Sequence, residues 1–191
     1  MDLTSFLIYC MIATFTPGPT NIVILSTVNR YGAKKAMKYS YGATVGFGLL
    51  LVFSALLNNL LITILPKILI AMQVIGSIYM LYLAYLICKT NSSNPTVNQT
   101  ATFLSGFMMQ FLNPKVVLFT LTVIPTFIMP YYSAAPAITL SIIAITLIGF
   151  LAFTTWVLFG TIFKELIQKH NRIVSVAMAI LLVYAAIMIW I

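Results

Sequence analysis

The sequence is short of the side chains on which most enzymes and metal proteins depend. Its 191 residues include two carboxylates, Asp2 and Glu165, together with one histidine and two cysteines. These are too few for paired carboxylates, a metal-ligand cluster or a nucleophile–base pair, and the sequence has no phosphate-binding glycine loop. We therefore expect no enzymatic activity, no metal site, no cofactor and no ATP-driven pumping by this chain alone.

Charge of either sign is also scarce. Only 6% of the residues are charged, 62% are hydrophobic, and the mean hydropathy is +1.09. A soluble domain of this size could not hide so much apolar surface, because its exterior would have to be mostly apolar too. Long apolar stretches with few charges are typical of membrane helices. The sequence thus predicts an all-α integral membrane protein that is embedded in the lipid bilayer.

Polar or proline-bearing breaks divide the chain into about six transmembrane helices. They cover approximately residues 3–28, 39–61, 68–88, 101–128, 137–163 and 173–191. One long polar linker, at about 90–100, separates the third helix from the fourth. We predict a single membrane domain over residues 1–191, with a first repeat at about 1–89 and a second at about 101–191.

The basic residues indicate how the chain is oriented. Eight of them fall in alternate connections, on one predicted side of the membrane: Arg30, Lys34, Lys35, Lys38, Lys89, Lys164, Lys169 and Arg172. Lys67 falls on the other side and Lys115 inside a helix. Because Lys and Arg favour cytoplasmic loops, both termini are predicted to lie outside. The net charge of +8 is scattered over these loops, so we expect no nucleic-acid partner.

The two halves resemble each other. Pro17 and Pro114 are 97 positions apart. The same offset aligns Phe6 with Phe103, Leu7 with Leu104 and Met11 with Met108. An odd number of spans in each half gives the halves opposite orientations in the membrane. This pattern predicts two inverted three-helix repeats with broken first and fourth helices, a plan found in many secondary transporters.

The first break contains Pro17, Gly18 and Pro19, followed by Thr20 and Asn21. Proline lacks an N–H and clashes with the preceding turn. In lipid, the freed backbone groups are tolerated only where they face protein or a watery cavity. A packing kink is the alternative, since proline and glycine are common in membrane helices. Two prolines around a glycine, followed by polar residues, favour a binding site.

The second break is Gln110–Lys115, deep in the fourth predicted helix. A lysine there costs about 2.5–3.5 kcal/mol on insertion scales and usually marks a pathway or site. The alternative is that Lys115 extends to the cytoplasmic surface. Unwound helix starts offer N–H groups to a carboxylate, and unwound carbonyls can hold an ammonium group. A zwitterionic amino acid would satisfy both.

These arguments select a set of candidate substrate-binding residues from the two breaks. They are Thr16, Pro17, Gly18, Pro19, Asn21, Asn113, Pro114 and Lys115. We expect the prolines and Gly18 to hold the helices open, the two asparagines to hydrogen-bond substrate or each other, and Lys115 to supply charge. The glycines between Gly42 and Gly48 are expected to serve close helix packing.

At these residues the sequence resembles the lysine exporter (LysE/RhtB) family of bacterial amino-acid exporters. The matching segments are 16–22, 30–32, 42–48, 76–83, 111–119 and 181–184. Residues 110–115 and 126–130 look most like the cysteine and O-acetylserine exporter branch. The resemblance implies about six spans and export from the cytoplasm by proton antiport. Many family members carry an acidic residue in the second span, where this chain has Thr44, Val45 and Gly46. A cationic substrate is therefore not expected.

The sequence thus predicts a secondary exporter of small neutral amino acids or their derivatives, such as cysteine, O-acetylserine, threonine or homoserine. We expect it in the bacterial cytoplasmic (inner) membrane, with the proton as coupling ion, and its apolar surface permits a homodimer. One alternative is a membrane thiol–disulfide carrier that uses Cys10 and Cys88. Another is a metal-ion exporter of similar architecture, against which the shortage of ligands argues.

Overall fold

The computed structural model describes residues 2–89 and 101–188, and the regular structure in these ranges is entirely helical. The elements are α1 Leu3–Phe15, α2 Pro19–Tyr31, α3 Ala33–Lys89, α4 Phe103–Leu112, α5 Pro114–Val123, η2 Ile124–Ile128 (one π-helical turn), α6 Ala135–Ile162, α7 Lys164–Lys169 and α8 Asn171–Met188. The expectation of an all-α protein is confirmed for this part of the chain. The predicted linker at 90–100 lies outside the described residues, as do residues 189–191.

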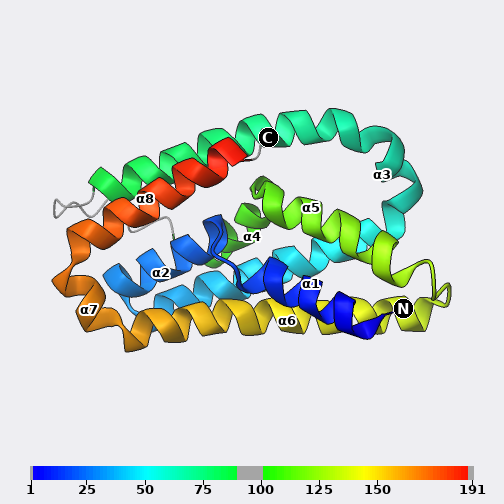
Figure 1. Cartoon of the computed structure of the whole chain (residues 1–191), viewed down its shortest axis with the longest axis horizontal. Coiled ribbons are helices and arrows are strands. Elements are labelled where there is room, and N and C mark those ends of the chain that lie inside the picture. The colour runs from blue at the N-terminus through cyan, green and yellow to red at the C-terminus, as the bar shows by residue number, and fades with distance from the viewer. Residues whose placement is uncertain (1, 90–100, 189–191) are drawn as a thin grey trace.

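Most of the helices run along the long axis of the molecule, and α3 folds back on itself (Figure 1). Its two arms correspond to the second and third predicted spans. The sequence predicted a break between them near residues 61–68, whereas the helical backbone continues from Ala33 to Lys89. A sharp bend within α3 reverses the direction of the chain (Figure 1). A proline can kink a helix without ending it, so a kink and a helix boundary give the same signal in the sequence.

Two stretches of helix are long and apolar enough to cross a membrane, Ala33–Leu57 and Ala135–Ile162. Two bent pairs would each form one further crossing: α1 with α2, at 47°, and Phe103–Leu112 with Pro114–Ile128, at 69°. The apolar helices Gln73–Tyr85 and Arg172–Ile187 are shorter. The described chain therefore has two to four candidate spans by length and composition. Both predicted breaks lie near the middle of the long axis (Figure 1).

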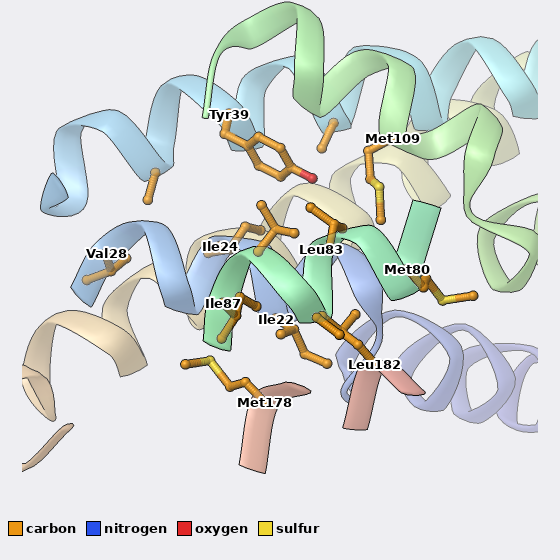
Figure 2. Close-up of a cluster of buried hydrophobic side chains, with 14 of the residues drawn as sticks. Ile22, Ile24, Val28, Tyr39, Met80, Leu83, Ile87, Met109, Met178 and Leu182 are labelled. Carbon is orange, nitrogen blue, oxygen red and sulfur yellow. The ribbon is translucent and has the colours of Figure 1, made fainter. Parts of the chain in front are cut away.

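A cluster of buried apolar side chains joins the two halves (Figure 2). Ile24 on α2 and Met109 on α4 belong to it, and so do Met80 on the second arm of α3 and Leu182 on α8. Many large apolar side chains outside this cluster are exposed, such as Leu56 and Ile162 at 74% each. Burial in this protein brings the helices together, while the exposed apolar surface suits contact with lipid.

The first arm of α3 packs against α4 through glycines. A Cβ atom on Gly42 would lie 1.9 Å from the carbonyl oxygen of Phe103, and one on Gly106 would lie 2.1 Å from that of Tyr39. Such distances leave no room for any side chain, so the two backbones are in direct contact. The packing role predicted for the glycines of residues 42–48 is confirmed at Gly42 and Gly46, the latter facing the Phe107 carbonyl.

Candidate functional site

The first break separates α1, which ends at Phe15, from α2, which begins at Pro19. Thr16 and Gly18 are both extended, with ψ of 145° and 176°. Each precedes a proline, and the helical conformation is unfavourable for a residue that precedes a proline. Two prolines separated by one residue therefore keep the chain out of the helix for three residues. Gly18 is extended at φ −156°, a conformation open to any residue, so its backbone does not require glycine.

Side chains satisfy the carbonyl groups that the end of α1 leaves free. Asn21 donates from Nδ2 to the carbonyl oxygens of Thr14 (3.3 Å) and Thr16 (3.0 Å). The indole of Trp156, on α6, donates to the carbonyl of Phe15 (3.1 Å). Asn21 thus stabilises the break to which it belongs. It makes no hydrogen bond to Asn113 in this structure, although such a pair was one of the sequence-based expectations.

The second break consists of one residue, Asn113, between the end of α4 and Pro114 at the first position of α5. The Asn113 carbonyl accepts hydrogen bonds from the N–H groups of Val116 and Val117, each at 3.0 Å. Gly76, on the second arm of α3, packs against it so closely that a Cβ would lie 2.7 Å from the Leu112 carbonyl. The second break is therefore only one residue long, and the second arm of α3 packs directly against it.

The structure changes how the prolines of the two halves correspond. The sequence offset paired Pro17 with Pro114, but Pro114 and Pro19 are the residues that occupy the first position of a helix. Pro17 lies within the first break. Proline is favoured at a first helical position because its missing N–H would have no partner there. The offset holds up to the ends of α1 and α4, after which the first break is two residues longer.

A buried polar cluster joins the two breaks. Asn113 donates from Nδ2 to Thr20 Oγ1 (3.0 Å), and Gln110 donates from Nε2 to the same oxygen (3.3 Å). All three side chains are almost fully buried. Thr20 and Gln110 were not among the predicted site residues. Gln110 lies one helical turn before Asn113, a spacing that places both on one face and was available in the sequence.

Three side-chain oxygens of this region are buried without a hydrogen-bond partner in the described structure: Asn21 Oδ1, Gln110 Oε1 and Asn113 Oδ1. Buried polar atoms in native proteins are nearly always paired, and leaving one unpaired costs about 1–3 kcal/mol. Acceptors of this kind, next to two broken helices, are suited to binding a polar donor.

Lys115 crosses from the second break to the first. Its Nζ donates to both oxygens of Thr16, the carbonyl at 3.0 Å and Oγ1 at 2.7 Å. Its stem passes over Gly18, where a Cβ would lie 3.2 Å from Lys115 Cδ. The side chain is half-buried, and its ammonium group is directed to the first break. Its charge lies at the negative end of the α1 dipole, a favourable position for a cation.

Two cavities meet at Lys115. The larger cavity has a volume of about 610 Å³ and is lined by all the predicted site residues except Thr16 and Asn21. The remainder of its lining comes from Ile22, Met80, Leu118, Leu181, Tyr184 and Ala185. A smaller cavity, of about 30 Å³, lies among Thr14, Thr20 and Asn21. Gly18, Asn113 and Lys115 border both. The larger volume is within the range of small-molecule sites.

This arrangement suits a small zwitterion. The first turn of α2 has N–H groups at Thr20 and Asn21 without an intrahelical acceptor, since the first intrahelical bond is donated by Ile22. These N–H groups can bind a carboxylate, and the Thr16 carbonyl, which accepts from Lys115 in this structure, is the kind of acceptor that an ammonium group needs. No group of three or more His, Cys, Asp or Glu residues that could hold a metal occurs in residues 2–89 and 101–188.

A family model described as "LysE type translocator" matches residues 11–191 of the chain. The chain belongs to the LysE family. It is therefore a transport protein of the membrane and not an enzyme, and the family resemblance read from its motifs is confirmed.

Relatives of this LysE-family chain include proteins named "Cysteine/O-acetylserine efflux protein". The one from Salmonella paratyphi A is 30% identical over 191 residues, which is 100% of this chain and 98% of the relative. The one from Klebsiella pneumoniae is 31% identical over 189 residues, 98% and 96% of the two chains. The Escherichia coli K12 protein is 28% identical over 189 residues, 98% and 97%. No solved structure matches the chain.

Proposed function

We propose that this LysE-family protein exports small neutral amino acids or their derivatives from the cytoplasm by proton antiport. The candidate substrates are cysteine, O-acetylserine, threonine and homoserine. The names of the relatives support the first two. A chain without any carboxylate in its predicted spans has no counter-charge for a cationic side chain, which favours neutral substrates.

One observation carries this proposal: the two helix breaks meet at a cavity of about 610 Å³. Lys115 of one half donates to Thr16 of the other, and Asn113 donates to Thr20. A site made from both halves changes when the halves move relative to each other, which is what alternating access requires. We propose that substrate binds at this junction, to the residues of both breaks.

The membrane arrangement we propose has six crossings in two inverted repeats, with both termini outside the bacterial inner membrane. The two bent pairs, the two arms of α3, α6 and α8 would form the crossings. The bend of α3 and the start of α1 lie at one end of the molecule, and α7 and the end of α2 at the other (Figure 1). The exposed apolar surface permits a homodimer, which cross-linking in native membranes would detect.

Efflux measurements test the proposal directly. Cells with and without the protein are loaded with a labelled mixture of amino acids, and loss of each is followed before and after a protonophore is added. We expect faster loss of a few neutral amino acids, and collapse of this difference with the protonophore. Equal loss of every amino acid in the two strains would contradict the proposed substrate class.

Substitution of the site residues should separate binding from folding. We expect Asn113→Ala and Lys115→Ala to abolish export, because each removes a polar contact between the two halves. Lys38→Ala is the matched control, since Lys38 is exposed on α3 outside both cavities, and it should export normally. Membrane abundance and the unfolding temperature in detergent show that the variants fold. Normal export by both site variants would refute the site assignment.

The alternative of a thiol–disulfide carrier has little support from the structure. Cys10 is fully buried in α1, and Cys88 is exposed near the end of α3. Neither lines a cavity beside a break. We expect a Cys10→Ser/Cys88→Ser variant to export at close to the normal rate, whereas loss of transport would favour redox chemistry. A metal-ion exporter would need a ligand cluster, and the described residues contain none.

A further inference from the structure

We propose that Lys115 is the residue that carries the coupling proton, and that its ammonium group and that of the substrate take turns on the two oxygens of Thr16. The inference deepens the proposed function and rests on it, because it assigns the proton of the antiport to one side chain. The contacts of Lys115 and the shortage of other groups able to exchange a proton support this assignment.

Carboxylates and histidine, the usual proton carriers in transporters, are scarce in this protein. The sequence holds two carboxylates and one histidine. Asp2 is exposed and caps the start of α1, Glu165 is exposed on α7, and His170 is exposed between α7 and α8. None of the three lines either cavity at the breaks. The residues that usually carry protons in transporters are thus absent from the site.

Tyrosines also face Lys115 and its helix. From α8, Tyr184 lines the larger cavity; from α1, Tyr9 shares a hydrogen bond with Thr122 of α5. From α3, Met80 lines the larger cavity together with Lys115, and it is uncharged. A lysine held away from water can release its proton, whereas an arginine stays charged.

The position of the Lys115 ammonium group supports the exchange. Lys115 Nζ lies 3.0 Å from the carbonyl oxygen and 2.7 Å from Oγ1 of Thr16. Thr16 O is one of the carbonyls released by the first break, the kind of acceptor that an amino-acid ammonium needs. Two ammonium groups cannot share these oxygens, because like charges in a half-buried site repel strongly. Substrate binds well only after Lys115 has lost its proton.

The exchange balances in charge and atoms. With the site open to the cytoplasm, the Lys115 ammonium releases one proton to water and becomes a neutral amine. The substrate ammonium then takes the Thr16 oxygens, and its carboxylate takes the free N–H groups of α2. After the site opens outward the substrate leaves, and Lys115 takes up one proton from that side and returns to Thr16. Each cycle moves one zwitterion out and one proton in, and the N–H bond of Lys115 is the one that breaks and forms.

Proton release on binding tests this assignment. Purified protein in weakly buffered detergent solution is mixed with O-acetylserine, and released protons are counted with a pH indicator while binding is measured with labelled ligand. We expect the wild type to release close to one proton per ligand bound. Lys38→Gln, the exposed control, should match it. Lys115→Gln should bind without releasing a proton, because it has no competing ammonium group on Thr16. Lys115→Arg should lose binding at least tenfold, because a permanent cation stays on Thr16.

The dependence of binding on pH provides a second readout, which does not require the glutamine variant to bind tightly. Acid keeps Lys115 protonated. The affinity of the wild type for its substrate should therefore weaken up to tenfold for each unit by which the pH falls below the pKa of the Lys115 ammonium group. Binding to Lys115→Gln should not change with pH over that range.

Three outcomes would overturn the assignment of the proton to Lys115. They are proton release by Lys115→Gln, uphill transport by this variant in liposomes with an imposed pH gradient, and wild-type affinity that is independent of pH. Failure of the wild type to bind or transport any neutral amino acid is a different result. It is seen before any variant is made, and it overturns the proposed function itself.

Discussion

Single residues at the two breaks replace hydrogen bonds that a continuous helix would have made. Asn21, Trp156 and Lys115 donate to three consecutive carbonyls at the end of α1, those of Thr14, Phe15 and Thr16. A lysine in a membrane costs about 2.5–3.5 kcal/mol on insertion scales. Two hydrogen bonds to Thr16 and the negative end of the α1 dipole offset part of this cost.

The role of glycine at position 18 can be tested through its contact with Lys115. Since the backbone there is extended, alanine is compatible with it, and the conflict is the 3.2 Å approach of a Cβ to Lys115 Cδ. We expect Gly18→Ala to destabilise the wild type by up to about 1 kcal/mol, since a lysine stem can shift slightly. In a Lys115→Ala background the same change should be neutral or stabilising by about 0.4–1 kcal/mol.

Unfolding of the four proteins in detergent micelles gives this double-mutant cycle. Equal effects of Gly18→Ala in the two backgrounds would show that the glycine does not make room for Lys115.

Pairs of elements are held together by backbone contact where glycines allow it. The first arm of α3 lies directly on α4 through Gly42, Gly46 and Gly106, and the second arm approaches the α4–α5 break at Gly76. Membrane helices gain little from burying apolar groups against each other, so close packing of small residues becomes a main source of association. The long helix α3 therefore holds α4 and the second break from both sides.

Alanine substitutions at glycines should reveal this packing. A Cβ on Gly106 would meet the backbone of Tyr39 at 2.1 Å, which cannot move without separating the helices. We expect Gly106→Ala to lower the free energy of unfolding by about 1–3 kcal/mol or more. Gly48→Ala is the control, because its Cβ would lie 3.3 Å from the Thr146 side chain, and it should cost less than about 1 kcal/mol. Similar unfolding temperatures for the two variants would contradict the packing.

The whole molecule has a basic end. Arg30 lies in the last turn of α2, Lys34 and Lys38 lie at the start of α3, and Lys169 is the last residue of α7. The end of α2 and α7 lie at the same end of the molecule, opposite the bend of α3 (Figure 1). Because positive residues favour the cytoplasmic side, this end is the one that we expect in the cytoplasm.

The native cysteines provide a test of this orientation. Cys88 is exposed near the end of the second arm of α3, whereas Cys10 is buried. A membrane-impermeant maleimide should therefore label Cys88 in inside-out vesicles but not in intact spheroplasts. A Thr4→Cys substitution in a Cys88→Ser background should show the reverse pattern, because Thr4 is exposed in the first turn of α1. Labelling of Cys88 in spheroplasts would invert the proposed topology.

The sequence by itself determined the class of the protein, the position of its breaks and its family. Composition required a membrane environment, and proline cannot continue a helix whatever surrounds it. The breaks at residues 16–18 and 113 are local consequences of this chemistry, and so is the extended Gly18 before Pro19. The glycines of the first arm of α3 indicated close packing for the same reason, since only a small residue lets two backbones meet.

Only the tertiary structure decided which groups the breaks bring together. That Lys115 reaches Thr16, that Asn113 and Gln110 share Thr20, and that Asn21 caps α1 depend on contacts between residues some 90–100 positions apart or on the angle of a break. Periodicity describes one helix at a time and carries no information on how two bent helices cross. The bend within α3 was hidden for a related reason, because a kinked helix and two separate helices share the same proline signal.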